Sequence, residues 1–174
     1  FMVGRSRTAV QDVEYSLDRL VEMAARALSP GVNDPFTALT CLDQAERTFS
    51  KLAVRRFPSA ERFDEEDRLR ILTDPVSFDH LLKRTIDPIR QYGCGQALVS
   101  RRLLEVLGTI ARHARSDSNR AQALAAAERV WESTSKAQAE DPLLPELEGV
   151  YRGVMSVHSN RDGSNGSHSG PVIR

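Results

Sequence analysis

The residues best suited to chemistry lie in a short linker between two expected helices. Residues 26–38 read Arg-Ala-Leu-Ser-Pro-Gly-Val-Asn-Asp-Pro-Phe-Thr-Ala, and such a linker has few accessible backbone conformations. The linker would point the side chains of Asn33 and Asp34, and the free N–H groups that open the second helix, at one small volume, where an anion is favoured, and Arg26 would add a cation. One interpretation is a small-ligand or anion site built on this loop. Two other interpretations stay open: Asp34 and Thr37 merely cap the helix while Asn33 adopts a left-handed turn, or the loop docks a partner.

Other motifs with recognisable chemistry are absent from the sequence. Its histidines are His80, His113, His158 and His168, and no two have His-x-x-x-His spacing. Cys41 and Cys94 lie far apart, which favours free thiols in a reducing compartment over a disulfide or a metal site. There is no Gly-x-Ser-x-Gly elbow and no phosphate-binding glycine loop. We therefore expect no metal, no cofactor and no catalysis. An enzyme acting on a small anion at the Asn33-Asp34 loop is the alternative, and it would need a carboxylate with a raised pKa.

Composition sets the class of protein. The chain has 174 residues, enough for one domain, with 24 basic and 24 acidic side chains and therefore no net charge. This balance argues against a nucleic-acid binder, which needs excess cations. The hydrophobic content of 40% and charged content of 28% are those of a globular protein. No segment has the roughly 18 uninterrupted apolar residues of a spanning helix.

The apolar residues repeat with a helical period along most of the chain. We expect an all-α bundle of about six helices over residues 1–157, followed by a disordered tail over 158–174 that is rich in Ser, Gly and Asn. The expected helices run from Val13 to Leu28, from Asp34-Pro35 to about Phe57, from Thr73-Asp74-Pro75 to about Tyr92, from Val99 to Ala114, over about 120–139, and from Asp141-Pro142 through Val154.

Three further expectations concern less regular segments. Residues 58–67 are interpreted as a solvated loop because they are polar and largely acidic. Leu69–Leu72 has the composition of a short strand, but it has no evident partner and is given little weight. Pro88 should kink the third helix or split it in two.

Two motifs resemble a known family. Arg7, Thr8, Gln11 and Asp12 form an R-T-x-x-Q-D pattern, and residues 27–38 contain A-L-S-P-G-V-N-D-P followed by Thr-Ala. Together they resemble a family of bacterial predicted membrane proteins known only as the domain of unknown function DUF2254. A weaker similarity covers Ile89-Arg90-Gln91-Tyr92. The similarity is strong over residues 4–43 and fair to about 115, and Tyr15-Ser16 departs from the aromatic-Gly pair that is frequent in the family.

The resemblance implies a location and no reaction. Members of the family carry several transmembrane helices in their amino-terminal half, and this sequence has none. The chain is therefore expected to be the extramembrane carboxy-terminal part of a bacterial membrane protein, or a truncated gene product. We expect it to lie on the cytoplasmic side of the cell membrane, attached through the preceding segments, and to be soluble by itself.

The expected function is non-enzymatic: oligomerisation, or sensing of an unidentified small ligand or partner. The candidate ligand or interface residues are Arg7, Thr8, Gln11, Asp12, Arg26, Ser29, Asn33, Asp34, Thr37 and Arg90. Gln11 and Asp12 would lie at one end of the first helix, and Arg26 and Asn33 at the other, about 25 Å away at 1.5 Å per residue. Two antiparallel copies would bring these groups together. The spacing therefore suggests a homodimer.

Overall fold

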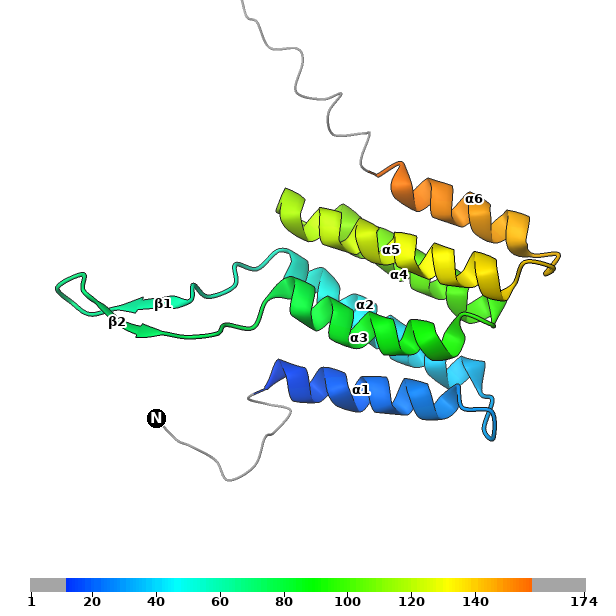
Figure 1. Ribbon diagram of the computed structural model, residues 1–174, viewed down its shortest axis with the longest axis horizontal. Coiled ribbons are helices and arrows are strands. Elements are labelled where there is room, and N and C mark those ends of the chain that lie inside the picture. The colour runs from blue at the N-terminus through cyan, green and yellow to red at the C-terminus, as the bar shows by residue number, and fades with distance from the viewer. Residues whose placement is uncertain (1–11, 158–174) are drawn as a thin grey trace, which may run out of the picture.

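Helices account for most of the chain in the computed structural model, which describes residues 12–157 (Figure 1). Within that range the helices are α1 (Val13–Ala27), α2 (Pro35–Ala53), α3 (Phe78–Gly93), α4 (Ala97–His113), α5 (Asp117–Ala137) and α6 (Leu144–Met155). An antiparallel hairpin of β1 (Glu61–Phe63) and β2 (Leu69–Leu72) lies between α2 and α3. The all-α prediction is confirmed. The tail predicted over 158–174 lies outside the described residues.

Four of the helices begin at a side chain that accepts hydrogen bonds from the first free backbone N–H groups. These N-cap residues are Asp12 for α1, Asp34 for α2, Ser77 for α3 and Ser116 for α5. The N–H groups of the first turn have no partner inside the helix, so such a side chain fixes where the helix starts. The predicted Asp34-Pro35 start of α2 is confirmed.

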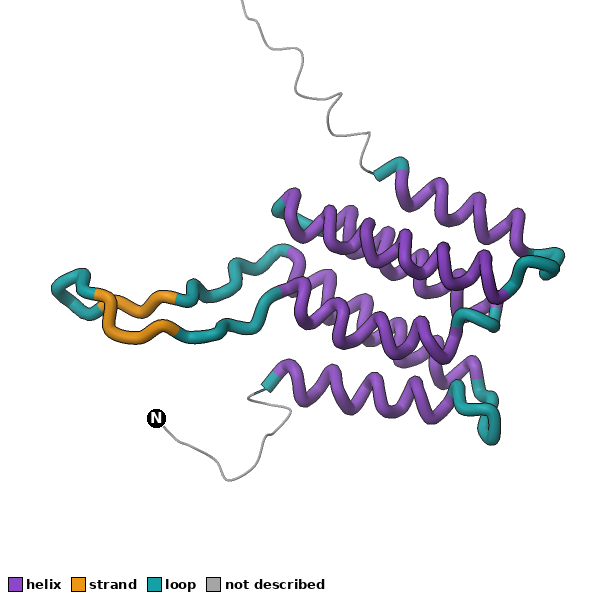
Figure 2. The backbone as a smooth tube through the Cα atoms, in the orientation of Figure 1, coloured by secondary structure: helices purple, strands orange, loops and turns teal. Residues whose placement is uncertain are grey.

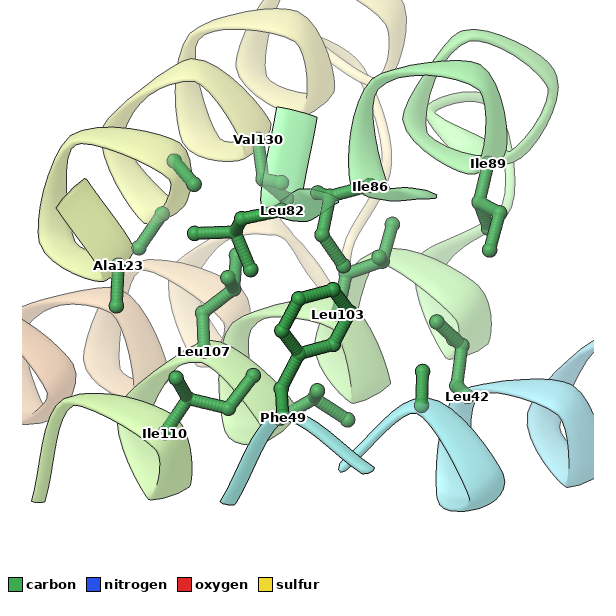
Figure 3. Close-up of a cluster of buried hydrophobic side chains, with 14 of the residues drawn as sticks. Leu42, Phe49, Leu82, Ile86, Ile89, Leu103, Leu107, Ile110, Ala123 and Val130 are labelled. Atoms are coloured by element: carbon green, nitrogen blue, oxygen red, sulfur yellow. The ribbon is translucent and has the colours of Figure 1, made fainter. Parts of the chain in front are cut away.

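The core is centred on α4, which packs against α2, α3, α5 and α6. Figure 3 shows Leu103, Leu107 and Ile110 of α4 among side chains from three of these helices. The other labelled side chains are Leu42 and Phe49 of α2, Leu82, Ile86 and Ile89 of α3, and Ala123 and Val130 of α5, and all ten are fully buried. Each helix has one apolar stripe that must be buried. The stripes of α2, α3, α5 and α6 all pack against α4, which therefore forms the centre of the core.

The last helix is held against α4 and α5 by close packing. A Cβ atom placed on Gly108 of α4 would lie 2.9 Å from Cγ2 of Val154 in α6, so glycine lets the two backbones approach. The rings of Trp131 in α5 and Tyr151 in α6 stack with their centroids 5.3 Å apart.

The β-hairpin corrects two expectations. Residues 58–67 are not simply a solvated loop, because they contain β1, and Leu69–Leu72 has a partner after all. Glu61 pairs with Leu72, and Arg62 pairs with Ile71. Asp64 holds the turn by accepting hydrogen bonds from the N–H groups of Glu66 and Arg68. An acidic sequence therefore makes a defined turn, since aspartate side chains readily replace backbone acceptors.

Three other predictions about helix boundaries are wrong. The third helix begins after Ser77 and not at Asp74-Pro75, because Ser77 accepts the hydrogen bond of the His80 N–H group. Pro88 does not split the third helix: it lies inside one continuous α3, where the buried Ile86 and Ile89 on either side hold the helix against the core. The last helix begins at Leu144. Asp141 accepts a hydrogen bond from the Leu143 N–H group and so forms the preceding turn.

Candidate functional site

The linker between α1 and α2 is closed by its own backbone. The N–H groups of Val32 and Asn33 both donate to the carbonyl of Ser29, at 3.0 and 2.9 Å, and the Asp34 N–H group donates to the carbonyl of Ala27 at 2.8 Å. Asn33 has a φ of 47°, a left-handed conformation that asparagine tolerates better than most residues. The predicted left-handed turn at Asn33 is therefore present.

Asp34 uses its carboxylate on the helix it opens. Oδ1 accepts hydrogen bonds from the N–H groups of Phe36 and Thr37 at 3.1 and 3.2 Å, and Oδ2 accepts one from the Thr37 hydroxyl at 2.5 Å. The Thr37 hydroxyl, its N–H group and that of Phe36 hold the pKa of Asp34 below its ordinary value, because they stabilise the charged form against the opposing effect of burial. A carboxylate with a lowered pKa is a weak base. This geometry favours capping over general-base chemistry at Asp34.

Asn33 ties the linker to a distant part of the chain. Its Oδ1 accepts a hydrogen bond from Nε2 of Gln96, at 3.1 Å, in the turn between α3 and α4. The backbone beside that turn is packed tightly: a Cβ on Gly93 would lie 2.6 Å from Cγ1 of Val99 and 3.5 Å from Cδ1 of Leu28. Gly93 therefore lets the ends of α1, α3 and α4 meet at one end of the bundle.

A buried polar cluster lies at the same end, and sequence reasoning missed it. The Thr134 hydroxyl donates to Oγ of Ser100 at 3.0 Å, and Nε2 of Gln138 donates to the carbonyl of Cys94 at 2.6 Å. Oε1 of Gln138 is buried and has no hydrogen-bond partner among residues 12–157. Ser100 stands directly beside Val99 on the apolar stripe of α4, and this interruption of the stripe was the available signal.

The other predicted residues that the structure describes have partners of their own. Arg26 is exposed and pairs with Glu22 at 3.4 Å, while the Ser29 hydroxyl donates to the Arg26 carbonyl at 2.7 Å. Arg90 donates to the Ser133 hydroxyl and so connects α3 to α5 instead of joining the linker. Arg7, Thr8 and Gln11 lie outside the described residues.

Among the candidates within residues 12–157, the structure brings five together and leaves Asp12 and Arg90 apart from them. Arg26, Ser29, Asn33, Asp34 and Thr37 gather at one end of α1, and Asp12 caps the other end. The 15 residues of α1 span about 22 Å at 1.5 Å per residue, so Asp12 does not reach the linker within one chain (Figure 1).

A second surface, absent from the sequence-based set, runs along the outer side of α1 and α2. One hollow of about 420 Å³ includes Leu20, Met23 and Cys41 in its lining, and another of about 390 Å³ adjoins it. Gln44 and Arg47 line both hollows, and Lys51 and Arg55 continue along the second. We call Arg47, Lys51 and Arg55 the basic stripe of α2. Arg47 and Lys51 are spaced four residues apart and so share one face of the helix, and Arg55 lies just beyond the end of α2 at Ala53 and lines the same hollow.

The β-hairpin forms a third surface. It projects from the end of the bundle opposite the α1–α2 linker (Figures 1 and 2). Four large apolar side chains on it are each more than half exposed: Phe63, Leu69, Ile71 and Leu72. Apolar side chains gathered on a projecting element mark an interaction surface, because water contact with them is unfavourable.

These observations define a helical-bundle domain with one capped linker and two surfaces suited to contact. Comparison with known sequences identifies it further: residues 1–109 match the predicted membrane protein family DUF2254, and the chain belongs to that family. The chain is also similar to uncharacterized proteins of Mycobacterium bovis and Mycobacterium tuberculosis, with 35% identity over 118 residues. No solved structure matches it.

The match covers 68% of this chain but only 23% of each mycobacterial relative, so the chain spans about a quarter of their length. Within residues 12–157, no helix combines the length and the hydropathy that a bilayer crossing requires. The same residues contain no cluster of three or more His, Cys, Asp or Glu side chains placed to hold a metal ion.

Proposed function

We propose that this chain is a non-enzymatic helical domain of a bacterial membrane protein, and that it assembles with further copies of itself on the cytoplasmic side of the membrane. The observation that carries the proposal is the β-hairpin, which holds Phe63, Leu69, Ile71 and Leu72 in solvent away from the core. Burying such side chains in an interface is favourable by about 25 cal/mol per Å² of apolar surface removed from water.

Two further features support the proposal. Asp34, the central residue of the predicted anion site, directs its oxygens at the backbone and hydroxyl of its own helix, which accounts for its presence without a substrate. Cys41 and Cys94 are free thiols, as is usual in the reducing cytoplasm.

Light scattering of the 174-residue chain over a range of concentrations tests the assembly. We expect a mass of at least twice 19.4 kDa, and a return to 19.4 kDa in the variant Ile71→Ser/Leu72→Ser. Leu143→Ser is the matched control, because Leu143 is similarly exposed but lies before α6. A parent chain that stays monomeric at high concentration contradicts the proposal.

The side of the membrane is tested in the full-length membrane protein. Lys136 is exposed near the end of α5, so Lys136→Cys introduces an accessible thiol. In intact cells we expect a membrane-permeant maleimide to label it and an impermeant one to leave it unlabelled. Labelling by the impermeant reagent would place the domain outside the cell.

A further inference from the structure

The hairpin and the basic stripe of α2 are complementary in charge. Residues 61–70 of the hairpin contain five carboxylates and three arginines, and the turn itself reads Asp64-Glu65-Glu66-Asp67. Two of the arginines are already neutralised, because Arg70 pairs with Asp64 at 2.6 Å and Arg68 with Glu66 at 3.7 Å. The hairpin is therefore an acidic arm whose strands are apolar.

The basic stripe has the opposite character. Arg47, Lys51 and Arg55 are exposed, and no carboxylate within residues 12–157 forms an ion pair with them. Other arginines on the bundle are paired with carboxylates: Arg84 binds Asp18, and Arg102 binds both Asp43 and Glu46. Arg47, Lys51 and Arg55 line the second hollow, which has no carboxylate in its lining. Arg47 also lines the first hollow with the apolar Leu20 and Met23, where the carboxylate of Asp43 is paired with Arg102.

The two surfaces do not meet within one chain. The hairpin leaves the bundle beyond the carboxyl end of α2 and extends away from it (Figures 1 and 2). The stripe instead lines the hollows beside α2. Only another molecule can bring an acidic apolar arm against a basic hollowed face. A second copy carries both surfaces, so a two-fold arrangement satisfies both contacts at once.

We propose that the domain forms a dimer by arm exchange, in which the β-hairpin of each copy lies in the α1–α2 groove of the other. The carboxylates of the arm pair with Arg47, Lys51 and Arg55, and its apolar side chains cover the Leu20–Met23 hollow. This inference rests on the proposed self-assembly and names the surfaces that make it. Complementary charge sets the register and excludes wrong partners, while apolar burial supplies the affinity.

Charge exchange tests the pairing. In Arg47→Glu/Lys51→Glu/Arg55→Glu we expect the dimer dissociation constant to rise roughly tenfold or more. The new carboxylates would face the carboxylates of the arm, and like charges across an interface repel. Glu61→Lys/Glu65→Lys should weaken the dimer in the same way. These two carboxylates are chosen because neither holds the turn, which depends on Asp64. Lys136→Glu is the control, a charge reversal on α5 that should leave the dissociation constant unchanged, because α5 packs against α3, α4 and α6 and lines neither hollow.

The decisive measurement is the mixture of the two altered chains. Equimolar stripe and arm variants should form a heterodimer with at least one restored contact surface, which native mass spectrometry detects by mass. Circular dichroism must show that each variant keeps its helices. If the parent dimerises but the stripe variant dimerises equally tightly, arm exchange is wrong while self-assembly stands. If the parent is monomeric, both proposals fail.

The alternative role for the basic stripe is binding to an anionic membrane surface. A vesicle-binding experiment distinguishes this role from arm exchange. Sedimentation with vesicles of phosphatidylglycerol and phosphatidylcholine should leave the dimeric chain in solution, because the stripe is already covered by the arm. Strong vesicle binding that the stripe variant loses, together with an unchanged dimer, would assign the stripe to lipid and overturn the inference.

Discussion

Asn33 and Gln96 are joined by a hydrogen bond of 3.1 Å across 63 positions of sequence, and this bond fastens the α1–α2 linker to the α3–α4 turn. Asn33 contributes in two ways, since it also adopts the left-handed φ of 47° that closes the linker. The two contributions are separable by substitution, because glycine keeps the backbone conformation and alanine opposes it.

Substitution of Asn33 should therefore show which contributes more to stability, its hydrogen bond to Gln96 or its left-handed backbone conformation. Asn33→Ala loses the hydrogen bond and strains the backbone, and we expect the free energy of unfolding to fall by about 1–2 kcal/mol. Asn33→Gly loses only the hydrogen bond and should cost less. Urea denaturation followed by circular dichroism measures both. Equal losses would mean that the left-handed turn contributes nothing to stability.

Asp34 tests whether the linker does more than cap α2. Asp34→Ala removes the cap and should lower the Tm by roughly 2–4 °C, whereas Asp34→Asn should lower it less, because asparagine also caps well. Differential scanning calorimetry gives both values. A metabolite anion that stabilises the parent but not the Asp34→Asn chain would support the anion site that the sequence suggests, and no such shift is expected from capping alone.

The pH dependence of stability follows from the lowered pKa of Asp34. The Thr37 hydroxyl and two backbone N–H groups hold this pKa below 3.8, so the folded chain binds the proton less readily than the unfolded chain does. The stabilisation is therefore complete above pH 3.8 and is lost as the pH falls through the folded pKa. We expect the Tm difference between the parent and Asp34→Asn to be constant near neutral pH and to change only in acid. A difference that varied between pH 6 and 8 would exclude Asp34 as its source.

Gly108 should be intolerant of a side chain because α6 crosses α4 at this point. In Gly108→Ala the new Cβ would lie 2.9 Å from Cγ2 of Val154, and overpacking of this kind costs about 1–3 kcal/mol. Val154→Ala in the same chain should recover part of the loss by giving back the space. Gly149→Ala is the control, since a Cβ there would meet no atom within 4 Å apart from the adjacent residues and the backbone of its own helix. Chemical denaturation of the parent, the two single variants and the double variant gives a double-mutant cycle. Additive changes in the free energy of unfolding would show that residues 108 and 154 do not touch.

The helical architecture was predictable because each long helix carries a clear apolar stripe and several begin at strong caps. Asp34-Pro35 combines a capping carboxylate with a proline at the first helical position, and both signals are local. Asp74-Pro75 looks the same in sequence but opens no helix, because Ser77 offers a cap closer to the buried Phe78. Burial of Phe78 decides which of the two possible caps starts the helix, and the sequence does not show which residues are buried.

The sequence suggested one strand of the hairpin, Leu69–Leu72, but its partner strand was missed for a related reason. The two strands are three and four residues long, and β1 reads Glu-Arg-Phe, with one apolar residue. Neither strand covers the core, so no alternation of buried and exposed residues marks them. The contact of Asn33 with Gln96 was equally hidden, because nothing in the pattern of either segment indicates that they meet.

The central position of α4 also affects how the chain folds during its synthesis. Helices α1, α2 and α3 are synthesised first, yet Leu42, Phe49 and Leu82 are covered by a helix that begins only at residue 97. A nascent chain that ends before α4 leaves the ribosome with its apolar faces open to water and to chaperones. Truncation before residue 97 should thus produce a chaperone-bound, protease-sensitive product, and the appearance of α4 should mark the moment at which the bundle closes.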